Sequence, residues 1–157
     1  TIQSTALKTS KILAAEKGLP IPYLRRRNAS LTTIAPTGTL SILADCSSSI
    51  EPHFAKNYTK TVLNGNALQF GSNYSIKTSH EISPEWHVRM QAAFQSFTDN
   101  AVSKTINISN DANKGEVGKA IKLAYDLGCK GVTVYRDGSR NAPLSALSEC
   151  AGDKCLI

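Results

Sequence analysis

Residues 102–135 read VSKTINISNDANKGEVGKAIKLAYDLGCKGVTVY. The stretch opens and closes with runs rich in β-branched residues, 102–108 and 131–135, which are typical of buried strands. Between them, apolar residues recur at helical spacing and predict one helix over 110–127. Two strands joined by a helix favour parallel pairing, so the stretch predicts an α/β fold. The residues expected on the buried stripe of the helix are Val117, Ala120, Ile121, Ala124 and Leu127.

Other elements follow from local signals on either side. Ser83-Pro84-Glu85 predicts a helix start, because serine caps a helix and proline suits its first turn. This helix is expected to run to Asp99 and to bury Val88 and Ala92. The remaining expectations, in chain order, are a helix over 2–17, a buried strand over 29–34, helical segments over 40–45 and 48–62, a loop over 64–79 and a flexible tail over 139–157.

The segment 28–52, NASLTTIAPTGTLSILADCSSSIEP, carries a candidate ligand site. A strand that stops at a Pro/Gly turn and feeds a helix leaves several backbone N–H groups unpaired at the helix start. These groups, the helix dipole and nearby hydroxyls form an anion site, and phosphate is the usual anion. The alternative to an anion site is a plain strand–helix junction. The neighbouring serines at 47–49 and Glu51 would then have no part in ligand binding.

Composition and charge restrict the class of protein. The chain has 157 residues and 41% hydrophobic content, as in a single soluble globular domain. Its net charge is +6, and the excess lysine either is solvated or helps to hold phosphates. The one dense basic run, 25–27, faces a nucleotide, a nucleic acid or only water. Aromatic residues are few and do not alternate with basic ones, so we expect no nucleic-acid partner. No apolar run approaches membrane-spanning length and residues 1–17 lack a signal-peptide core, so we expect a cytoplasmic protein without membrane contact.

The four cysteines are Cys46, Cys129, Cys150 and Cys155. The last two are separated by four residues near the end of the chain, so they can close a small disulfide ring, which suits dithiol–disulfide exchange. A metal half-site without further ligands and an accidental pair are the alternatives. Cys46 and Cys129 lie among apolar residues and are expected to be small buried hydrophobes, and Trp86 and Met90 to be core or interface residues. No spacing of histidines predicts a metal site.

Three blocks of the sequence resemble a known family. RNASLTTIAPTGTLS…SSSIEPHF, ISPEWHVRMQAAFQSFTDNAVSKTIN and AYDLGCKGVTVYRDGSR are similar to consecutive blocks near the C-terminus of the large catalytic subunit of ribonucleotide reductase. The similarity is closest to the adenosylcobalamin-dependent, class II enzymes. It implies that residues 1–140 are the C-terminal part of the reductase barrel domain and that 141–157 form a flexible tail with a redox dithiol.

The resemblance implies a fold and a chemistry. The family folds as a ten-stranded α/β barrel around a catalytic finger loop, and this chain corresponds only to its C-terminal strands and helices. The family replaces the ribose 2′-hydroxyl of a ribonucleotide with hydrogen by a thiyl-radical mechanism. Tyr135 falls near the radical-transfer tyrosines of class I enzymes, and no role is assigned to it.

The resemblance also implies roles for site residues. The phosphate-binding loop and helix start of the family match Pro36, Thr37, Gly38, Thr39, Leu40 and Ser41. The neighbouring wall of the active site matches residues 47–52, which include Ser47 and Ser48. Cys150 and Cys155 would re-reduce the active-site disulfide after turnover and would then be reduced by thioredoxin or glutaredoxin.

The finger-loop block of the family has no counterpart in this sequence, and the 64–79 region is shorter than its family counterpart. Three predicted strands cannot close a barrel and would leave open edges. We therefore expect reductase activity only with an N-terminal reductase chain or fragment, with adenosylcobalamin bound to the assembled enzyme. Alternatives are a non-catalytic nucleotide-phosphate-binding remnant or regulator, and a nucleic-acid-binding domain that uses 25–27.

Overall fold

Strands β3 (Thr105–Ile108) and β4 (Thr133–Arg136) pair in parallel, and helix α4 (Lys114–Asp126) connects them. Thr105 lies opposite Thr133 in the ladder. The strand–helix–strand prediction is therefore confirmed, although the ends of the elements differ from the predicted ones by a few residues. Since α4 joins two parallel strands, the unit is the α/β arrangement that the sequence indicates.

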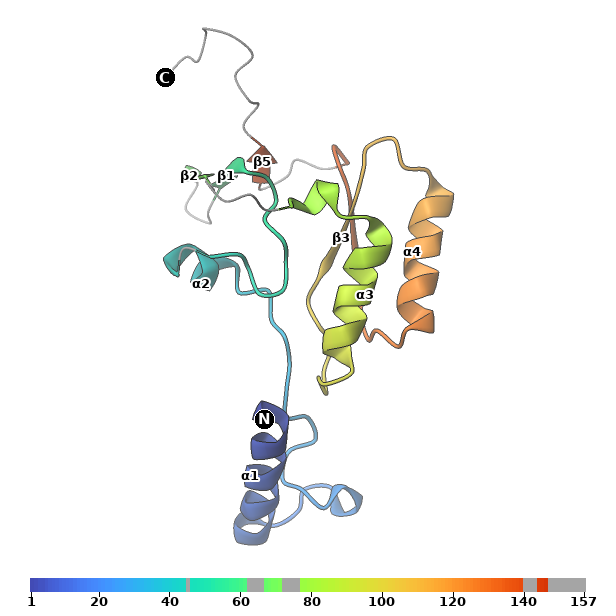
Figure 1. Ribbon diagram of the computed structural model, residues 1–157. Helices are drawn as coiled ribbons and strands as arrows, with labels where there is room; N and C mark the ends of the chain where they lie inside the picture. The colour runs from blue at the N-terminus through green and yellow to red at the C-terminus, as the bar shows by residue number, and fades with distance from the viewer. Residues whose placement is uncertain (45, 62–66, 72–76, 140–143, 147–157) are drawn as a thin grey trace, which may run out of the picture.

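The described part of the computed structural model comprises residues 1–44, 46–61, 67–71, 77–139 and 144–146. Figure 1 shows α3 (Pro84–Gln95) in front of β3, with α4 beside it. α1 (Ile2–Lys17) lies at the other end of the molecule, beyond the 28–36 segment. No helix among the described residues is long and apolar enough to cross a membrane.

The hydrophobic core lies between α3, α4 and β3. Its fully or nearly fully buried members are Val88, Ile106, Ile108, Ala112, Ala120 and Ala124. The buried stripe of α4 is narrower than predicted, because Ile121 and Leu127 are 45% and 40% exposed. Trp86 and Met90 are also exposed, so of the two expectations for them, core or interface, the structure excludes the core and the interface stays a prediction. Only one face of each helix is thus covered by the described residues.

Both helices of this unit begin where local sequence signals place them. α3 begins at Pro84, as the Ser-Pro-Glu signal predicts. At α4, Asn113 Oδ1 accepts the backbone N–H groups of Gly115 and Glu116, and the Glu116 carboxylate accepts Asn113 N in return. This capping box satisfies donors that a helix start leaves open. Gly128 follows α4 with a φ of 75°, a conformation that glycine adopts without strain.

The segment predicted as the strand 29–34 is extended but forms only an isolated parallel bridge, between Ile34 and Val102. Asn100 N donates to Thr32 O and Ser103 N donates to Ile34 O. Leu31 N also donates to an Asp99 carboxylate oxygen at 2.8 Å. The segment therefore lies alongside the stretch that leads into β3, and its end is held beside the start of that strand.

The stretch that follows differs most from prediction. α2 (Gly38–Leu43) replaces the helix expected over 40–45, and the described residues of 48–62 hold no helix. Instead β1 (Asn57–Thr61) pairs antiparallel with β2 (Ala67–Gly71), and β2 lies inside the loop expected over 64–79. β1 also pairs antiparallel with β5 (Leu144–Ala146), inside the expected tail. Strand pairing between distant segments overrides the local preference here.

Short 3-10 helices, η1 (Pro22–Leu24) and η2 (Ser79–Glu81), complete the described structure. Beside η1, Arg26 donates to Ala29 O, and Arg27 donates to Lys17 O and Gly18 O at the end of α1. Two of the three arginines in the basic run are therefore engaged with the chain's own backbone. Among the described residues the parallel sheet has two strands and is not closed, so the structure shows an α/β unit and not a complete barrel.

Candidate functional site

One large cleft opens at the side of the parallel sheet, with a volume of about 1360 Å³. Its walls come from the start of α2, the 47–54 segment, β3, β4 and the start of α4. Because Ile34 is bridged to Val102, the residues after Ile34 lie next to the start of β3. The site is therefore assembled from segments that are far apart in sequence. The polar residues on its walls include Ser47, Ser48, Glu51, Asn107, Asn113, Lys114, Arg136 and Ser139.

The start of α2 forms one wall of the cleft. Pro36 and Gly38 line the cleft, and Thr37 between them has a φ of 53°, in the left-handed region. Such a conformation is strained for a threonine and recurs at functional sites. Among the described residues no side chain caps this helix start at Thr37. The backbone at the start of α2 is thus presented without a side-chain cap beside the cleft.

A second wall, the hydroxyl loop (residues 47–51), is joined to α2 by a pair of serines. The Ser41 and Ser48 hydroxyls are hydrogen-bonded at 2.8 Å, and Ser41 Oγ also donates to Gly38 O. Ser41 is nearly buried, whereas Ser47 and Ser48 line the cleft. Ser49 has a φ of 51°, the second strained non-glycine residue of this site. The hydroxyl loop and α2 are therefore held together as one surface.

An ion pair fixes the hydroxyl loop to β3. Lys104 Nζ lies 2.7 Å from Glu51 Oε2, and the other carboxylate oxygen accepts Thr105 N. The Lys104 side chain is 2% exposed and that of Glu51 21%. Glu51 N donates to Ser48 O, which closes the turn of the loop. The negative charge of Glu51 is therefore compensated by the buried Lys104 ammonium, which does not itself line the cleft.

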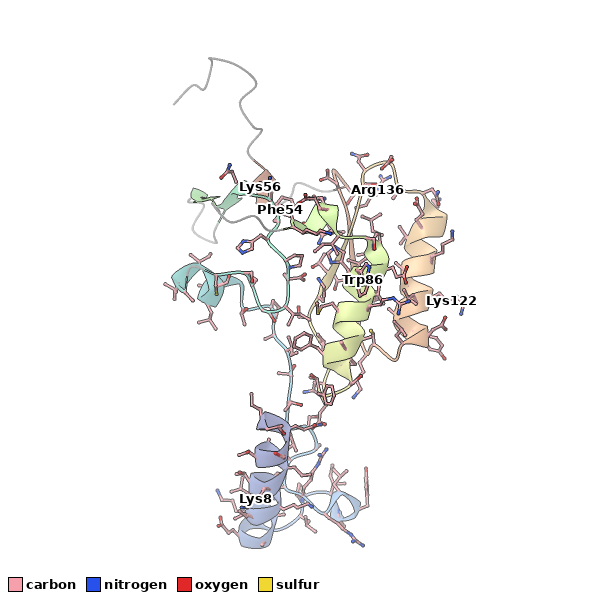
Figure 2. The ribbon with its side chains drawn as sticks, viewed as in Figure 1. Lys8, Phe54, Lys56, Trp86, Lys122 and Arg136 are labelled. Atoms are coloured by element: carbon pink, nitrogen blue, oxygen red, sulfur yellow. The ribbon has the colours of Figure 1, made fainter. Side chains whose placement is uncertain are left out.

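The opposite wall carries the cationic groups of the cleft. Lys114 and Asn113 bring the start of α4 to it, and Arg136 brings the end of β4. Arg136 Nη1 donates to Asn110 O at 3.2 Å, which ties the arginine to the loop after β3. Figure 2 shows Phe54 and Arg136 at the same end of the molecule, and both line the cleft. Tyr135 lines the same wall, half-buried.

A buried histidine supports the floor behind the cleft. His87 is 1% exposed, its Nε2 lies 3.0 Å from Ser79 O, and its Nδ1 has no hydrogen-bond partner among the described residues. Burial lowers the pKa of His87, and the Ser79 carbonyl partly opposes this effect. Ser79 in turn bonds to the backbone of His53 and Phe54, which line the cleft. His87 thus ties α3 to η2, and Ser79 ties η2 to the 53–54 segment.

The predicted phosphate residues fall into two groups. Pro36, Gly38, Ser47 and Ser48 line the cleft, and the structure brings them together. Thr37, Thr39, Leu40 and Ser41 belong to the same turn and helix but are not among the lining residues; Leu40 is 64% exposed and Ser41 is engaged in internal hydrogen bonds.

Sequence reasoning assigned no site role to Lys104, Lys114 or Arg136. A lysine that precedes a buried apolar strand, as Lys104 does, is the one local signal that could have been noticed.

The cysteines divide in the same way. Cys46 is exposed, so its expected burial is wrong, while Cys129 is partly buried against the core. Cys150 and Cys155 lie outside the described residues. Within the described ranges, no three His, Cys, Asp or Glu side chains are grouped so as to hold a metal ion.

Comparison with known proteins bears on this geometry. The family model for the ribonucleotide reductase barrel domain matches residues 24–76 and 69–135. A vitamin B12-dependent ribonucleoside-diphosphate reductase of Thermoplasma acidophilum is 40% identical over 88% of this chain, which spans 24% of that protein. The enzyme of the same name from Mycobacterium tuberculosis H37Rv is 30% identical over 98% of this chain and 30% of its own length.

Solved structures agree on the fold. The class Id ribonucleotide reductase alpha subunit of Actinobacillus ureae superposes with a TM-score of 0.66 at 23% identity, over 87% of this chain and 32% of that one. A B12-dependent, class II ribonucleotide reductase gives a TM-score of 0.59 at 17% identity over 91% of this chain and 24% of its own. The chain thus spans about a quarter to a third of its relatives. The resemblance seen in the sequence is confirmed: this chain belongs to the ribonucleotide reductase barrel-domain family.

Proposed function

We propose that this chain forms the phosphate-binding wall of a B12-dependent ribonucleotide reductase, which converts ribonucleotides to deoxyribonucleotides. The proposed contacts are the turn and helix start from Pro36 to Ser41 together with Ser47 and Ser48. The single observation that carries the proposal is the Ser41–Ser48 hydroxyl bond, because it joins the start of α2 and the hydroxyl loop into one surface on the cleft. The B12-dependent relatives, at up to 40% identity, favour the reductase over other phosphate binders.

The chemistry of the cleft suits an anionic group. Helix-start N–H groups and hydroxyls are hydrogen-bond donors for phosphate oxygens. On the facing wall, Lys114 and Arg136 add positive charge. The one carboxylate among the described lining residues, Glu51, is paired with Lys104. A phosphate that enters the cleft would therefore meet donors and cations, and a carboxylate whose charge is compensated.

The reaction requires more than this chain offers. Its two-stranded parallel sheet does not close a barrel, and the family's finger loop has no counterpart in the sequence. We propose that the remaining strands and the radical-forming residues come from the rest of the reductase. This chain's own contribution is then to bind and orient the substrate phosphates.

Adenosylcobalamin belongs to this proposal as the cofactor of the assembled enzyme, since the relatives are named for it. When bound it supplies radical initiation. The corrin ring supplies most of the ligands of its cobalt, so a cluster of three metal-binding side chains is not required to hold it, and no observation among the described residues identifies a cobalamin contact. We therefore assign no cobalamin contact to this chain.

Cys150 and Cys155 are proposed to act as a dithiol shuttle. In each turnover the two thiols would pass two electrons and two protons to the active-site disulfide and become a disulfide themselves. Thioredoxin or glutaredoxin would then return them to the dithiol by the same exchange. The support is the family resemblance of the tail and the short spacing of the two cysteines.

Calorimetric titration of the full chain with inorganic pyrophosphate tests the phosphate wall. Ser48→Ala removes a lining hydroxyl and the bond to Ser41, so we expect affinity to fall about fivefold, the equivalent of one hydrogen bond. Ser96→Ala is the matched control, since Ser96 Oγ donates to Ala92 O at the end of α3, outside the cleft lining. Unchanged affinity in Ser48→Ala, or an equal loss in Ser96→Ala, would contradict the proposal.

Turnover of the assembled reductase tests the dithiol. Cys150→Ser or Cys155→Ser should abolish thioredoxin-driven turnover and leave turnover with a small dithiol intact, because a small reductant reaches the active site directly. Cys46→Ser, which replaces an exposed cysteine, is the control and should affect neither. Equal loss with both reductants would rule out a shuttle.

A further inference from the structure

Lys104 is a buried lysine directly behind the cleft. The residue is 3% exposed, and its ammonium lies 2.7 Å from Glu51 Oε2 and 3.2 Å from Thr105 O. Lysines are almost never fully buried unless they are paired. A buried ion pair adds little net stability compared with an apolar pair, because desolvation offsets the attraction. The position of Lys104 therefore calls for a reason other than stability.

The partner of Lys104 faces the site. Glu51 lines the cleft, and it is the one carboxylate among the described lining residues. Without the lysine, a full negative charge would stand two residues from Ser49 and three from Ser48, on the wall proposed to receive phosphate. Like charges repel strongly where water is partly excluded. An uncompensated Glu51 would therefore oppose an anion in this cleft.

Glu51 also connects Lys104 to the rest of the wall. Glu51 N donates to Ser48 O at 2.8 Å, and the Ser48 hydroxyl is bonded to that of Ser41 in α2. The second carboxylate oxygen accepts Thr105 N at the start of β3. The Glu51 carboxylate thus fixes the hydroxyl loop to β3, and the Lys104 ammonium compensates the negative charge of that carboxylate.

We propose that Lys104 is a positioning residue of the phosphate site: its buried ammonium neutralises Glu51, so that the Ser47–Ser48 wall accepts an anion. The inference rests on the proposed phosphate wall and extends it to a residue that does not line the cleft. This role differs from a purely structural one, because the removal of Lys104 and the removal of the Glu51 charge should then have different effects on anion binding. Removal of the lysine should weaken anion binding, whereas removal of the glutamate charge should not.

Calorimetric titration of the full chain with inorganic pyrophosphate separates the two roles. We expect Lys104→Met to weaken binding about tenfold or more, because Glu51 is left uncompensated. Glu51→Gln should bind as well as the wild type or more tightly, since the ammonium then adds its charge to the site. The double variant Lys104→Met/Glu51→Gln should return to within about threefold of the wild type.

Two further variants control the experiment. Lys122→Met removes a lysine that is also paired, with Asp126 on the exposed face of α4 (Figure 2), and should leave binding unchanged. Lys104→Arg keeps the positive charge and should bind within about threefold of the wild type. Circular dichroism confirms that each variant is folded. If Lys104→Met does not fold, Lys104→Gln takes its place, since it removes the same charge and should weaken binding to the same extent.

The outcomes are distinct. Weaker binding in both single variants with no recovery in the double variant would overturn the inference in favour of a structural role. Equal binding of wild type and Lys104→Met would overturn it while leaving the phosphate wall intact. A double variant that binds about tenfold or more weakly than the wild type would overturn it in the same way. A wild-type chain that binds no pyrophosphate would overturn the phosphate wall itself, and this inference with it.

Discussion

Two regions of this chain are built on different principles. The unit of α3, β3, α4 and β4, residues 84–136, is held by an apolar core, helix caps and a regular parallel ladder. The cleft segment, residues 28–56, contains one short helix, a single bridge and a set of polar contacts to residues 79–105. The first region therefore serves as a support, and the second, placed on it by hydrogen bonds and an ion pair, supplies most of the proposed phosphate contacts.

The difference shows how a site is placed on this fold. Polar contacts between distant segments depend on direction, so they fix position where a short segment has little apolar surface to bury. Two non-glycine residues of the cleft segment, Thr37 and Ser49, have positive φ values beside the cleft. Such strain persists only when the surrounding structure enforces it. The cleft segment therefore depends on the support for its shape, a dependence that the predictions below test.

The largest expected effect comes from the core of the support. Ile106 of β3 is fully buried in the core, so Ile106→Ala should lower the free energy of unfolding by about 2–5 kcal/mol. Ile34→Ala, in the half-buried cleft segment, should have a clearly smaller effect. Urea denaturation followed by circular dichroism measures both. Equal losses would mean that the two regions share one core.

An intermediate effect is expected at the junction of the two regions. The Asp99 carboxylate accepts Leu31 N, so Asp99→Ala should loosen the 31–34 segment at a cost of about 1 kcal/mol, although the backbone bond from residue 99 N to Thr32 Oγ1 remains. Hydrogen exchange should accelerate at the amides of Asn100 and Ser103, which bond to this segment, and remain slow within α3. Asp126→Ala, on the surface of α4, is the matched control. Uniform acceleration across the chain would contradict the separation of the regions.

The smallest effect is a pH dependence at His87. Burial lowers its folded-state pKa below the ordinary value of 6.5, so the unfolded chain binds more protons as pH falls through that value. Stability from this residue is therefore present above pH 6.5 and is lost toward lower pH. The charged groups that act on His87, which are Lys104, Glu51 and His80, are all present in the control variant His87→Gln. The wild type should lose more stability between pH 7.5 and 5.5 than His87→Gln; identical losses would contradict a buried neutral imidazole.

The sequence predicts the secondary structure of the support better than that of the cleft segment and the strands that follow it. The elements of the support are encoded locally: apolar periodicity gives α4, β-branched runs give β3 and β4, and Ser83-Pro84 marks the start of α3. The 48–62 segment has helical composition but leads into β1, because pairing with β2 and β5 outweighs local propensity. Ile34 likewise forms a β-bridge with Val102, which lies 68 positions further along the chain. No local sequence pattern predicts a contact between residues so far apart.

The site was predictable where it depends on residue type and not where it depends on partners. The Pro/Gly turn, the hydroxyls and the family resemblance gave eight candidates, residues 36–41 with Ser47 and Ser48. Four of them, Pro36, Gly38, Ser47 and Ser48, line the cleft, and their contact with phosphate stays a prediction. The role of Ser41 as an internal bridge depends on Ser48 lying opposite, which sequence spacing does not specify. Lys114 and Arg136 gain meaning only when the fold brings them to one cleft, and Lys104 only when the fold pairs it with Glu51 of that cleft. Cys150 and Cys155 stay a prediction, outside the described residues.

The central claim is that the start of α2 and the hydroxyl loop together hold the phosphates of a ribonucleotide. The most direct test is to titrate the isotopically labelled full chain with a ribonucleoside diphosphate and to follow backbone amide shifts by NMR. The account predicts that the largest shifts cluster at Gly38, Ser47 and Ser48, and that Ser48→Ala reduces them. Shifts that concentrate instead at Arg25–Arg27, with none at the cleft, would contradict it.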